Sequence, residues 1–116
     1  MIIDNRKLQS RIMSALADEH MRRILQSTSI SDRPVTDIIK EQDLSHSTAY
    51  KKIGELVKWG LLVQFKSEII EGKRVAYYKS IFRSIKINYI GPLEATVEAE
   101  PNEDALERIS LRFYDL

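Results

Sequence analysis

The stretch VTDIIKEQDLSHSTAYKKIGELVKWGLL, residues 35–62, decides the fold of this chain. It contains two runs of apolar residues at helical spacing, the first with Ile38 and Ile39 and the second with Ile53 and Leu56. A face with this spacing packs on a core and leaves the rest of the helix in solvent. The stretch therefore predicts two amphipathic helices with a short connection between them.

The ends of both helices carry their own signals. Thr36 offers an N-cap hydroxyl for the short first helix, and Asp43 is a residue type that tolerates the left-handed conformation of a tight turn. Ser45 is the expected N-cap of the longer helix, predicted at residues 46–59 and ended by Gly60 at C′. A helix, a tight turn and a longer helix form the helix-turn-helix arrangement.

Two further helices are predicted upstream of this unit. The first covers residues 4–16, where Leu8 and Ile12 lie on one face, and the second begins near Asp18. The polar segment QSTSISDRP, residues 26–34, is rich in Ser and Thr and is expected to be a surface loop.

Downstream of Gly60 the pattern changes from helical to extended. LLVQFKSEII (61–70) and RVAYYKSI (74–81) are rich in β-branched and aromatic residues, with a turn at Gly72, and predict a β-hairpin. SIKINYI (84–90) and LEATVEAE (93–100) alternate more regularly and predict a second hairpin.

The C-terminal segment is expected to end in a helix capped by Asn102. Leu106, Ile109 and Phe113 form an apolar stripe along it. Together these elements predict an α+β fold.

Composition excludes several classes of function. The chain has 116 residues, 43% of them apolar and none of them Cys, which suits one domain without disulfides or thiolate metal sites. No apolar run approaches the roughly 20 residues of a membrane span, so we expect a soluble, cytoplasmic protein. Its two histidines, His20 and His46, have no metal-ligand spacing, and no phosphate loop or catalytic triad pattern is present. We therefore expect no enzyme, no metal and no cofactor.

The net charge of +1 conceals an asymmetry along the chain. Residues 1–90 hold 16 Lys and Arg against 10 Asp and Glu, whereas residues 91–116 hold 2 against 7. A basic body with an acidic tail suits a surface that meets a polyanion on one side, although surface charges often serve only solubility.

Over residues 8–81 the chain resembles the winged helix-turn-helix of the ArsR-like transcription regulators of bacteria and archaea. VTDIIKEQDLSHSTAYKKI and the WGLL that leads into the hairpin carry the resemblance. It implies a DNA-binding domain at residues 1–81, and residues 82–116 resemble the hairpin-plus-helix extension of some archaeal members. The resemblance also implies a homodimer that associates with the nucleoid when it is bound to DNA.

The candidate DNA contacts lie on the longer helix and on the first hairpin, which would be the wing. The outward residues of the helix are His46, Ser47, Thr48, Tyr50, Lys51 and Lys52. Ser47, Tyr50 and Lys51 are expected at base edges in the major groove, and Thr48 and Lys52 at phosphates. On the wing, at residues 66–74, Lys66, Lys73 and Arg74 are expected over the minor groove or its phosphates.

Each assignment has an alternative. Ser45, Ser47 and Thr48 can serve helix initiation alone, and a basic hairpin tip can be an ordinary solvated turn. The rival function is a winged-helix protein-interaction module without specific DNA binding.

The sequence alone leaves the dimer interface open. Helix one and the C-terminal stripe can form a dimer interface or close the core of the monomer. A small-molecule effector could bind in an apolar cavity between helix one and the tail, which no sequence pattern would announce. Gly54, in the middle of the expected recognition helix, costs about 1 kcal/mol of helix propensity relative to Ala and departs from the family pattern.

Overall fold

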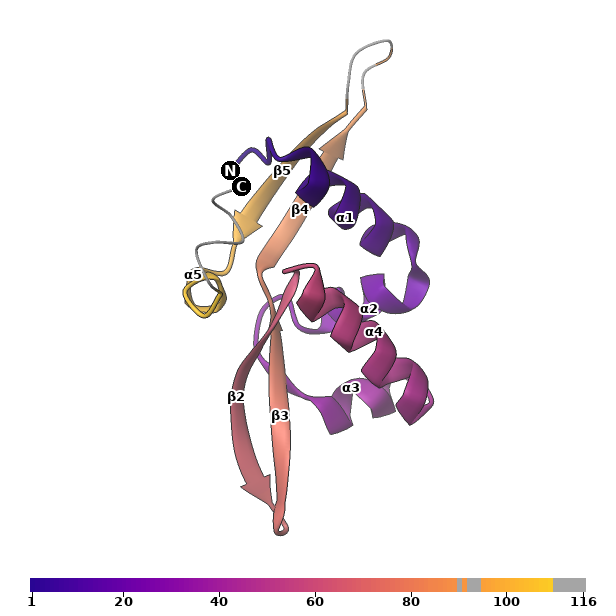
Figure 1. Cartoon of the computed structure of the whole chain (residues 1–116), viewed down its shortest axis with the longest axis vertical. Coiled ribbons are helices and arrows are strands. Elements are labelled where there is room, and N and C mark those ends of the chain that lie inside the picture. Colours follow the sequence, from indigo (N-terminus) through magenta and orange to yellow (C-terminus); the bar gives the residue numbers. More distant parts are fainter. Residues whose placement is uncertain (90, 92–94, 110–116) are drawn as a thin grey trace.

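The computed structural model describes residues 1–89, 91 and 95–109. Its elements, in chain order, are α1 (Arg6–Ala17), α2 (Glu19–Ser27), β1 (Arg33–Pro34), α3 (Val35–Gln42), α4 (His46–Lys58), β2 (Leu62–Ile70), β3 (Lys73–Ser80), β4 (Phe82–Asn88), β5 (Thr96–Pro101) and α5 (Glu103–Leu106). The predicted α+β class, with helices followed by two antiparallel hairpins, is confirmed (Figure 1).

The helix-turn-helix forms where local signals predict it. Asp43 adopts φ 50° and ends α3 in the left-handed region. The Oγ of Ser45 accepts a hydrogen bond of 3.2 Å from the backbone N–H of Thr48 and so caps α4. Gly60, at φ 77°, lets the chain turn from α4 into the first hairpin.

The expected start of α3 at Thr36 is wrong. The helix begins at Val35, its N-cap is Pro34, and no side chain caps it. Arg33 and Pro34 form the short strand β1 against Tyr77 and Tyr78 of β3, inside the segment expected to be a loop. Because the chain leaves the sheet at Pro34, the helix starts at the next residue and the Thr36 hydroxyl lies inside its first turn.

The wing is the antiparallel pair β2 and β3, which projects beyond the helices at one end of the molecule (Figure 1). Its two-residue turn has both Glu71 (φ 51°) and Gly72 (φ 78°) in the left-handed region, as a type I′ hairpin turn requires. A β-bulge between Gln64 and Lys66 interrupts the register of β2.

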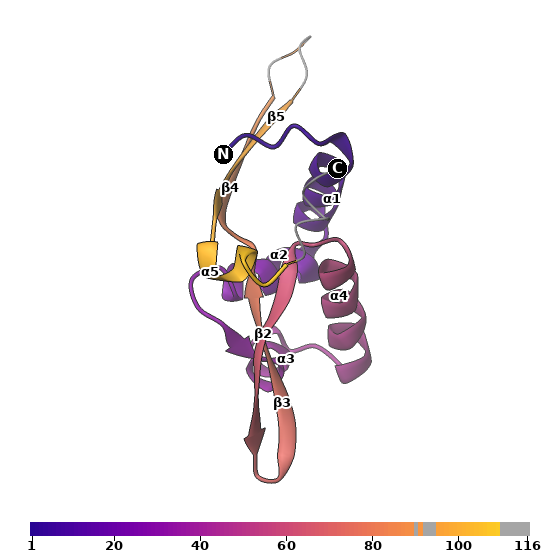
Figure 2. The same ribbon diagram turned by 60° about the vertical axis from the view of Figure 1, so that its left-hand side comes forward.

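The N-terminal residues pair with the second sheet, which the sequence did not predict. β4 pairs with β5, and Ile2 forms a bridge with Glu98 on β5. The N–H of Ile3 donates to the carbonyl of Val97, and the N–H of Ala99 donates to that of Met1, both at 2.8 Å. The first residues of the chain therefore run beside β5, as Figure 2 shows.

One hydrophobic core joins the helices to this second sheet. Leu8 and Ile12 of α1 belong to the same buried cluster as Val97, Ala99 and Ala105. The division of the chain at residue 81 stays a prediction, and the core continues across it.

The C-terminal segment is fixed at the base of the wing. Asn102 stands at the N-cap of α5, but its amide does not cap the helix; its Nδ2 donates to the carbonyls of Ser29 (2.8 Å) and Ser80 (2.9 Å). Leu106 and Ile109 pack against the core. Phe113, the last residue of the predicted stripe, and Pro92, which lies between the two strands predicted for the second hairpin, are outside the described residues.

None of the helices in the described part of the chain is long and apolar enough to cross a membrane.

Candidate nucleic-acid interface

The helix α4 is anchored by one face and exposed on the other. Ala49, Ile53 and Leu56 are buried. The residues of the opposite side are all exposed, and we call them the outer face of α4: His46, Ser47, Tyr50, Lys51, Gly54, Val57 and Lys58. Helical spacing explains this division, because residues three and four apart lie on the same side.

The outer face combines hydrogen-bonding groups with positive charge. Lys51 and Lys58 are its cations, Ser47, Tyr50 and His46 supply hydroxyls and an imidazole, and no Asp or Glu belongs to it. Tyr50 is 53% exposed, so its ring lies away from the core. Such a surface can donate to base edges and phosphate oxygens without repulsion from a carboxylate.

Thr48, a candidate phosphate contact, also takes part in the start of the helix. It is half-buried, and its Oγ1 accepts a hydrogen bond of 2.9 Å from the Oγ of Ser45. The interpretation of Ser45 as a cap is thus confirmed, and Thr48 shares the same hydrogen-bond network.

Lys52, the other candidate phosphate contact, is turned toward α2. Its Nζ lies 2.6 Å from Oδ2 of Asp18, and both side chains are less than one third exposed. The hydrogen bond from Lys52, together with that from the N–H of Met21, lowers the pKa of Asp18, and Asp18 in turn raises the pKa of Lys52. This ion pair keeps Lys52 off the outer face of α4.

The candidate residues of the wing lie in two different environments. Lys66 is 3.2 Å from Glu68 and 3.7 Å from Asp32, and it stands over the ring of Tyr77. Glu68 is the main cause of a raised pKa at Lys66. The positive charge of Lys66 is therefore largely balanced within the protein.

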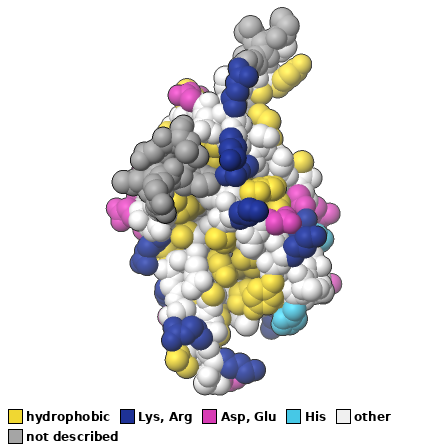
Figure 3. Space-filling view, viewed as in Figure 1, with side chains coloured by type: hydrophobic (Ala, Val, Ile, Leu, Met, Phe, Trp, Pro, Cys, Tyr) yellow, Lys and Arg dark blue, Asp and Glu magenta, His cyan; other side chains and the backbone are white. Residues whose placement is uncertain are grey.

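At the free end of the wing, two cations of β3 lie opposite two exposed isoleucines of β2. Ile69 pairs with Arg74 and Ile70 with Lys73 in the strand register, and Ile69 is 66% exposed. Arg74 donates to the Oγ of Ser67 at 3.1 Å. Lys and Arg side chains are visible at this end of the molecule in Figure 3.

In the described part of the chain, no three His, Cys, Asp or Glu side chains come close enough together to hold a metal ion. Asp18 accepts hydrogen bonds from the backbone N–H of Met21 and from the Nζ of Lys52. The Nδ1 of His20 is buried and has no hydrogen-bond partner among the described residues.

Comparison with known proteins supports the fold alone. No family model matches the chain, and no curated protein matches it. Among solved structures, HlyU from Vibrio cholerae N16961 is similar, with a TM-score of 0.55 and 18% sequence identity over 66% of this chain and 78% of that chain. The arrangement of helices and wing described above matches the winged-helix fold of HlyU.

Proposed function

We propose that this protein is a transcription regulator that binds double-stranded DNA in a sequence-specific manner. The helix α4 enters the major groove, and the wing formed by β2 and β3 lies on the adjacent minor groove or its phosphates. No catalytic step, metal or cofactor is part of this function.

The outer face of α4 carries the proposal. Ser47, Tyr50 and Lys51 lie on the first two turns, which are the turns that meet base edges when a recognition helix docks. Lys51 can pair with guanine, and Ser47 can serve several bases. The buried face of α4 and the Lys52–Asp18 ion pair hold this surface in one orientation, and such preorganisation lowers the entropy cost of binding.

The wing supplies contacts that do not depend on sequence. Lys73 and Arg74 are exposed at its free end and suit phosphates. The exposed Ile69 beside Arg74 suits the minor groove, where apolar side chains press against sugars and base steps. Lys66 forms an ion pair with Glu68, so its charge contributes less to DNA binding than its position in the sequence implies.

A homodimer is part of the proposal, because one recognition helix covers few base pairs and two half-sites about 34 Å apart give a longer site. The candidate interface residues Leu106 and Ile109 pack on the core of their own chain, and so do Leu8 and Ile12 of α1, so both candidate interfaces also close the core of the monomer. Since Val97 and Ala105 belong to that core, removal of the tail would unfold the protein. The oligomeric state is therefore best measured on the full chain, by sedimentation equilibrium.

The second candidate function is a protein-interaction module. The exposed Tyr50 and Val57 favour it, since aromatic and aliphatic groups form the centre of protein interfaces. Lys51 and Lys58 on the same face favour DNA, because charged residues are depleted from such centres.

The deciding experiment is selection of purified full-length protein on a pool of random-sequence duplexes at low and at physiological salt, followed by sequencing of the retained DNA. We expect an enriched, roughly palindromic motif that persists at the higher salt. Retention that disappears with salt and enriches no sequence would contradict specific DNA binding and favour the protein-interaction module.

A further inference from the structure

The wing projects from the body of the molecule as a ribbon that is fixed at its base. β2 and β3 pair with each other and close in the two-residue turn of Glu71 and Gly72. At the base, β1 pairs with β3, and the Nδ2 of Asn102 donates to the carbonyl of Ser80 at 2.9 Å. The wing and the N-terminal end of α4 reach toward the same end of the molecule (Figure 1 and Figure 2). A side chain at the free end of this ribbon is therefore held at a defined place relative to α4.

One face of the ribbon looks toward α4. Alternate residues of a strand share a face, and paired residues of two strands lie on the same face. We call the face toward α4 the inner face of the wing, which consists of Ser67, Ile69, Arg74, Ala76 and Tyr78. Arg74 donates to the Oγ of Ser67 at 3.1 Å across it. Burial and the nearby Tyr50, on the outer face of α4, raise the pKa of Tyr78, so the inner face is continuous with the proposed DNA-binding surface.

The two faces of the wing differ in charge. Arg74 is the one charged side chain of the inner face. The opposite face consists of Lys66, Glu68, Ile70, Lys73, Val75 and Tyr77. There the carboxylate of Glu68 accepts from the hydroxyl of Tyr77 at 3.0 Å and pairs with Lys66, which also lies 3.7 Å from Asp32. The inner face thus presents a cation without a carboxylate and suits a polyanion better than the opposite face does.

The size of the inner face at its free end decides how it can meet DNA. Ile69, which is 66% exposed, lies opposite Arg74, and in Figure 3 basic and apolar side chains meet at this end of the molecule. Paired residues have Cβ atoms about 5 Å apart, so the two side chains together are roughly 8 Å wide, more than the roughly 6 Å of a B-form minor groove. An arginine alone enters a narrow groove. Ile69 can reach the base steps only where the groove is widened, and apolar side chains that enter there kink the duplex toward the major groove.

We propose that the wing bends the DNA that this protein binds, with Ile69 as an apolar wedge in the minor groove beside Arg74. The inference rests on the proposed function, because it requires α4 to dock in the neighbouring major groove. A protein partner would find one large exposed aliphatic side chain on each face of the ribbon end, too few for the centre of an interface. Pyrimidine–purine steps such as TA and CA kink most easily, so we expect one of them under the wing in the selected sequences.

The test is the gel mobility of full-length protein bound to duplexes of equal length that carry the selected motif either at the centre or near one end. A central bend slows the complex most, and the bound fraction in the same lanes gives the affinity. We expect a bend of about 20° or more for each wing that contacts DNA. Saturable binding without a difference in mobility would overturn the inference and leave the proposed function standing. Absence of saturable binding would contradict the proposed function itself and the inference with it.

Variants of the two isoleucines separate the wedge from the rest of the wing. Ile69→Ala should remove at least half of the bend, whereas Ile69→Leu, which keeps the volume of the side chain, should retain it. Ile70→Ala, the same class of truncation on the opposite face, is the matched control and should bend DNA as the wild type does. Both positions are exposed, so circular dichroism should show both alanine variants folded. An unchanged bend with Ile69→Ala, or an equal loss with Ile70→Ala, would contradict the role given to Ile69.

Discussion

The Nζ of Lys52 lies 2.6 Å from the Oδ2 of Asp18, 34 residues earlier in the chain. The other oxygen of the same carboxylate, Oδ1, accepts the N–H of Met21 at 3.0 Å and caps α2. One side chain therefore starts α2 and holds α4 against it. Because α4 carries the proposed DNA-binding surface, this pair contributes to its orientation.

Substitution of Asp18 should destabilise the fold through two separable effects, the loss of the helix cap and the loss of the ion pair. Asp18→Ala removes both the cap and the ion pair, and we expect a loss of about 1–2 kcal/mol in the free energy of unfolding. Asp18→Asn keeps an oxygen that can cap α2, so its free energy of unfolding should fall by less. Urea unfolding followed by circular dichroism measures both. Glu19→Ala, which removes only the surface pair with Arg23, is the control, and a loss at Asp18→Ala no larger than that of the control would contradict the dual role.

Stability should fall in acid through the same carboxylate. The folded-state pKa of Asp18 is lowered from its ordinary value of 3.8, chiefly by the hydrogen bond from Lys52. Its contribution is therefore complete well above pH 3.8 and is lost as the pH falls through 3.8 toward the lowered pKa. The Asp18→Asn variant should be less stable than the wild type at about pH 6, and the difference should shrink toward about pH 3. A difference that stays constant over this range would show that the charge of Asp18 is not involved.

The elements of this fold that were predictable from sequence are those whose signal is local. Asp43 at the tight turn, Ser45 at the start of α4 and Gly72 in the wing turn each act through the backbone of their own or adjacent residues, and all three are where the sequence predicts them. Thr36 failed as a cap because β1 ends next to it. The pairing of Pro34 with Tyr77 is a contact between distant residues that no local pattern encodes.

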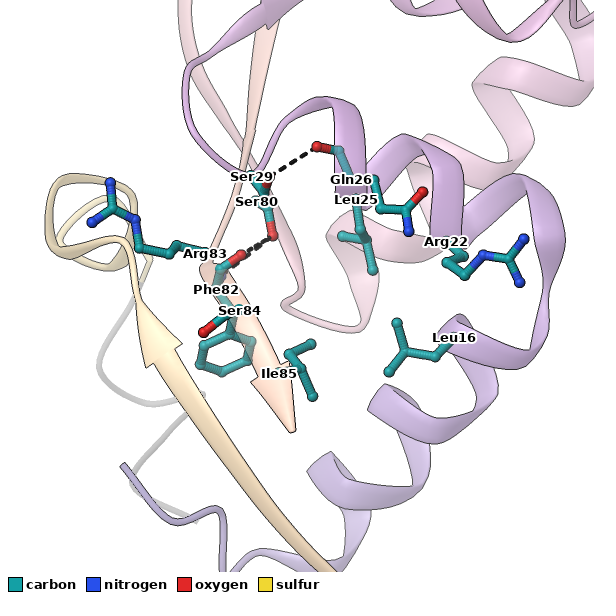
Figure 4. Close-up of a pocket in the computed structure, with 10 residues that line it drawn as sticks. All are labelled: Leu16, Arg22, Leu25, Gln26, Ser29, Ser80, Phe82, Arg83, Ser84 and Ile85. Carbon is teal, nitrogen blue, oxygen red and sulfur yellow. Dashed lines mark hydrogen bonds between the residues drawn. The ribbon is translucent and has the colours of Figure 1, made fainter. Parts of the chain in front are cut away.

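The candidate site was less predictable for the same reason. Helical periodicity identifies the outer face of α4, including Tyr50 and Lys51, but it cannot tell that Lys52 meets Asp18. Lys79 likewise binds Asp104 at 2.8 Å across 25 residues. A cavity of about 320 Å³ lined by residues of α1, α2 and β4 (Figure 4) likewise depends on how whole elements pack, so no local pattern in the sequence predicts it.

The two classes of DNA contact should respond differently to alanine. Lys51→Ala should cost roughly 1–3 kcal/mol on the selected site and relax the preference at one base pair. Lys73→Ala should weaken binding to all sequences alike and reduce the steepness of the plot of log affinity against log salt by about 1. Fluorescence anisotropy over a salt series, on the selected and on a scrambled duplex, measures both. Lys86→Ala is the matched control, since this exposed lysine lies on β4, outside α4 and the wing, and it should leave both the affinity and the salt slope unchanged.

Gly54 offers a test in which stability and DNA binding move in opposite directions. It lies in the interior of α4 on the outer face, and a Cβ added there meets nothing within 4 Å. Gly54→Ala should therefore stabilise the protein by about 1 kcal/mol, the difference in helix propensity between the two residues. If α4 enters the major groove with Gly54 close to the DNA backbone, the same variant should bind the selected duplex more weakly, because the new methyl group then meets DNA and nothing in the protein. A more stable variant with unchanged affinity would place Gly54 away from the DNA and restrict the docking surface to the first two turns of α4, around Ser47 and Lys51.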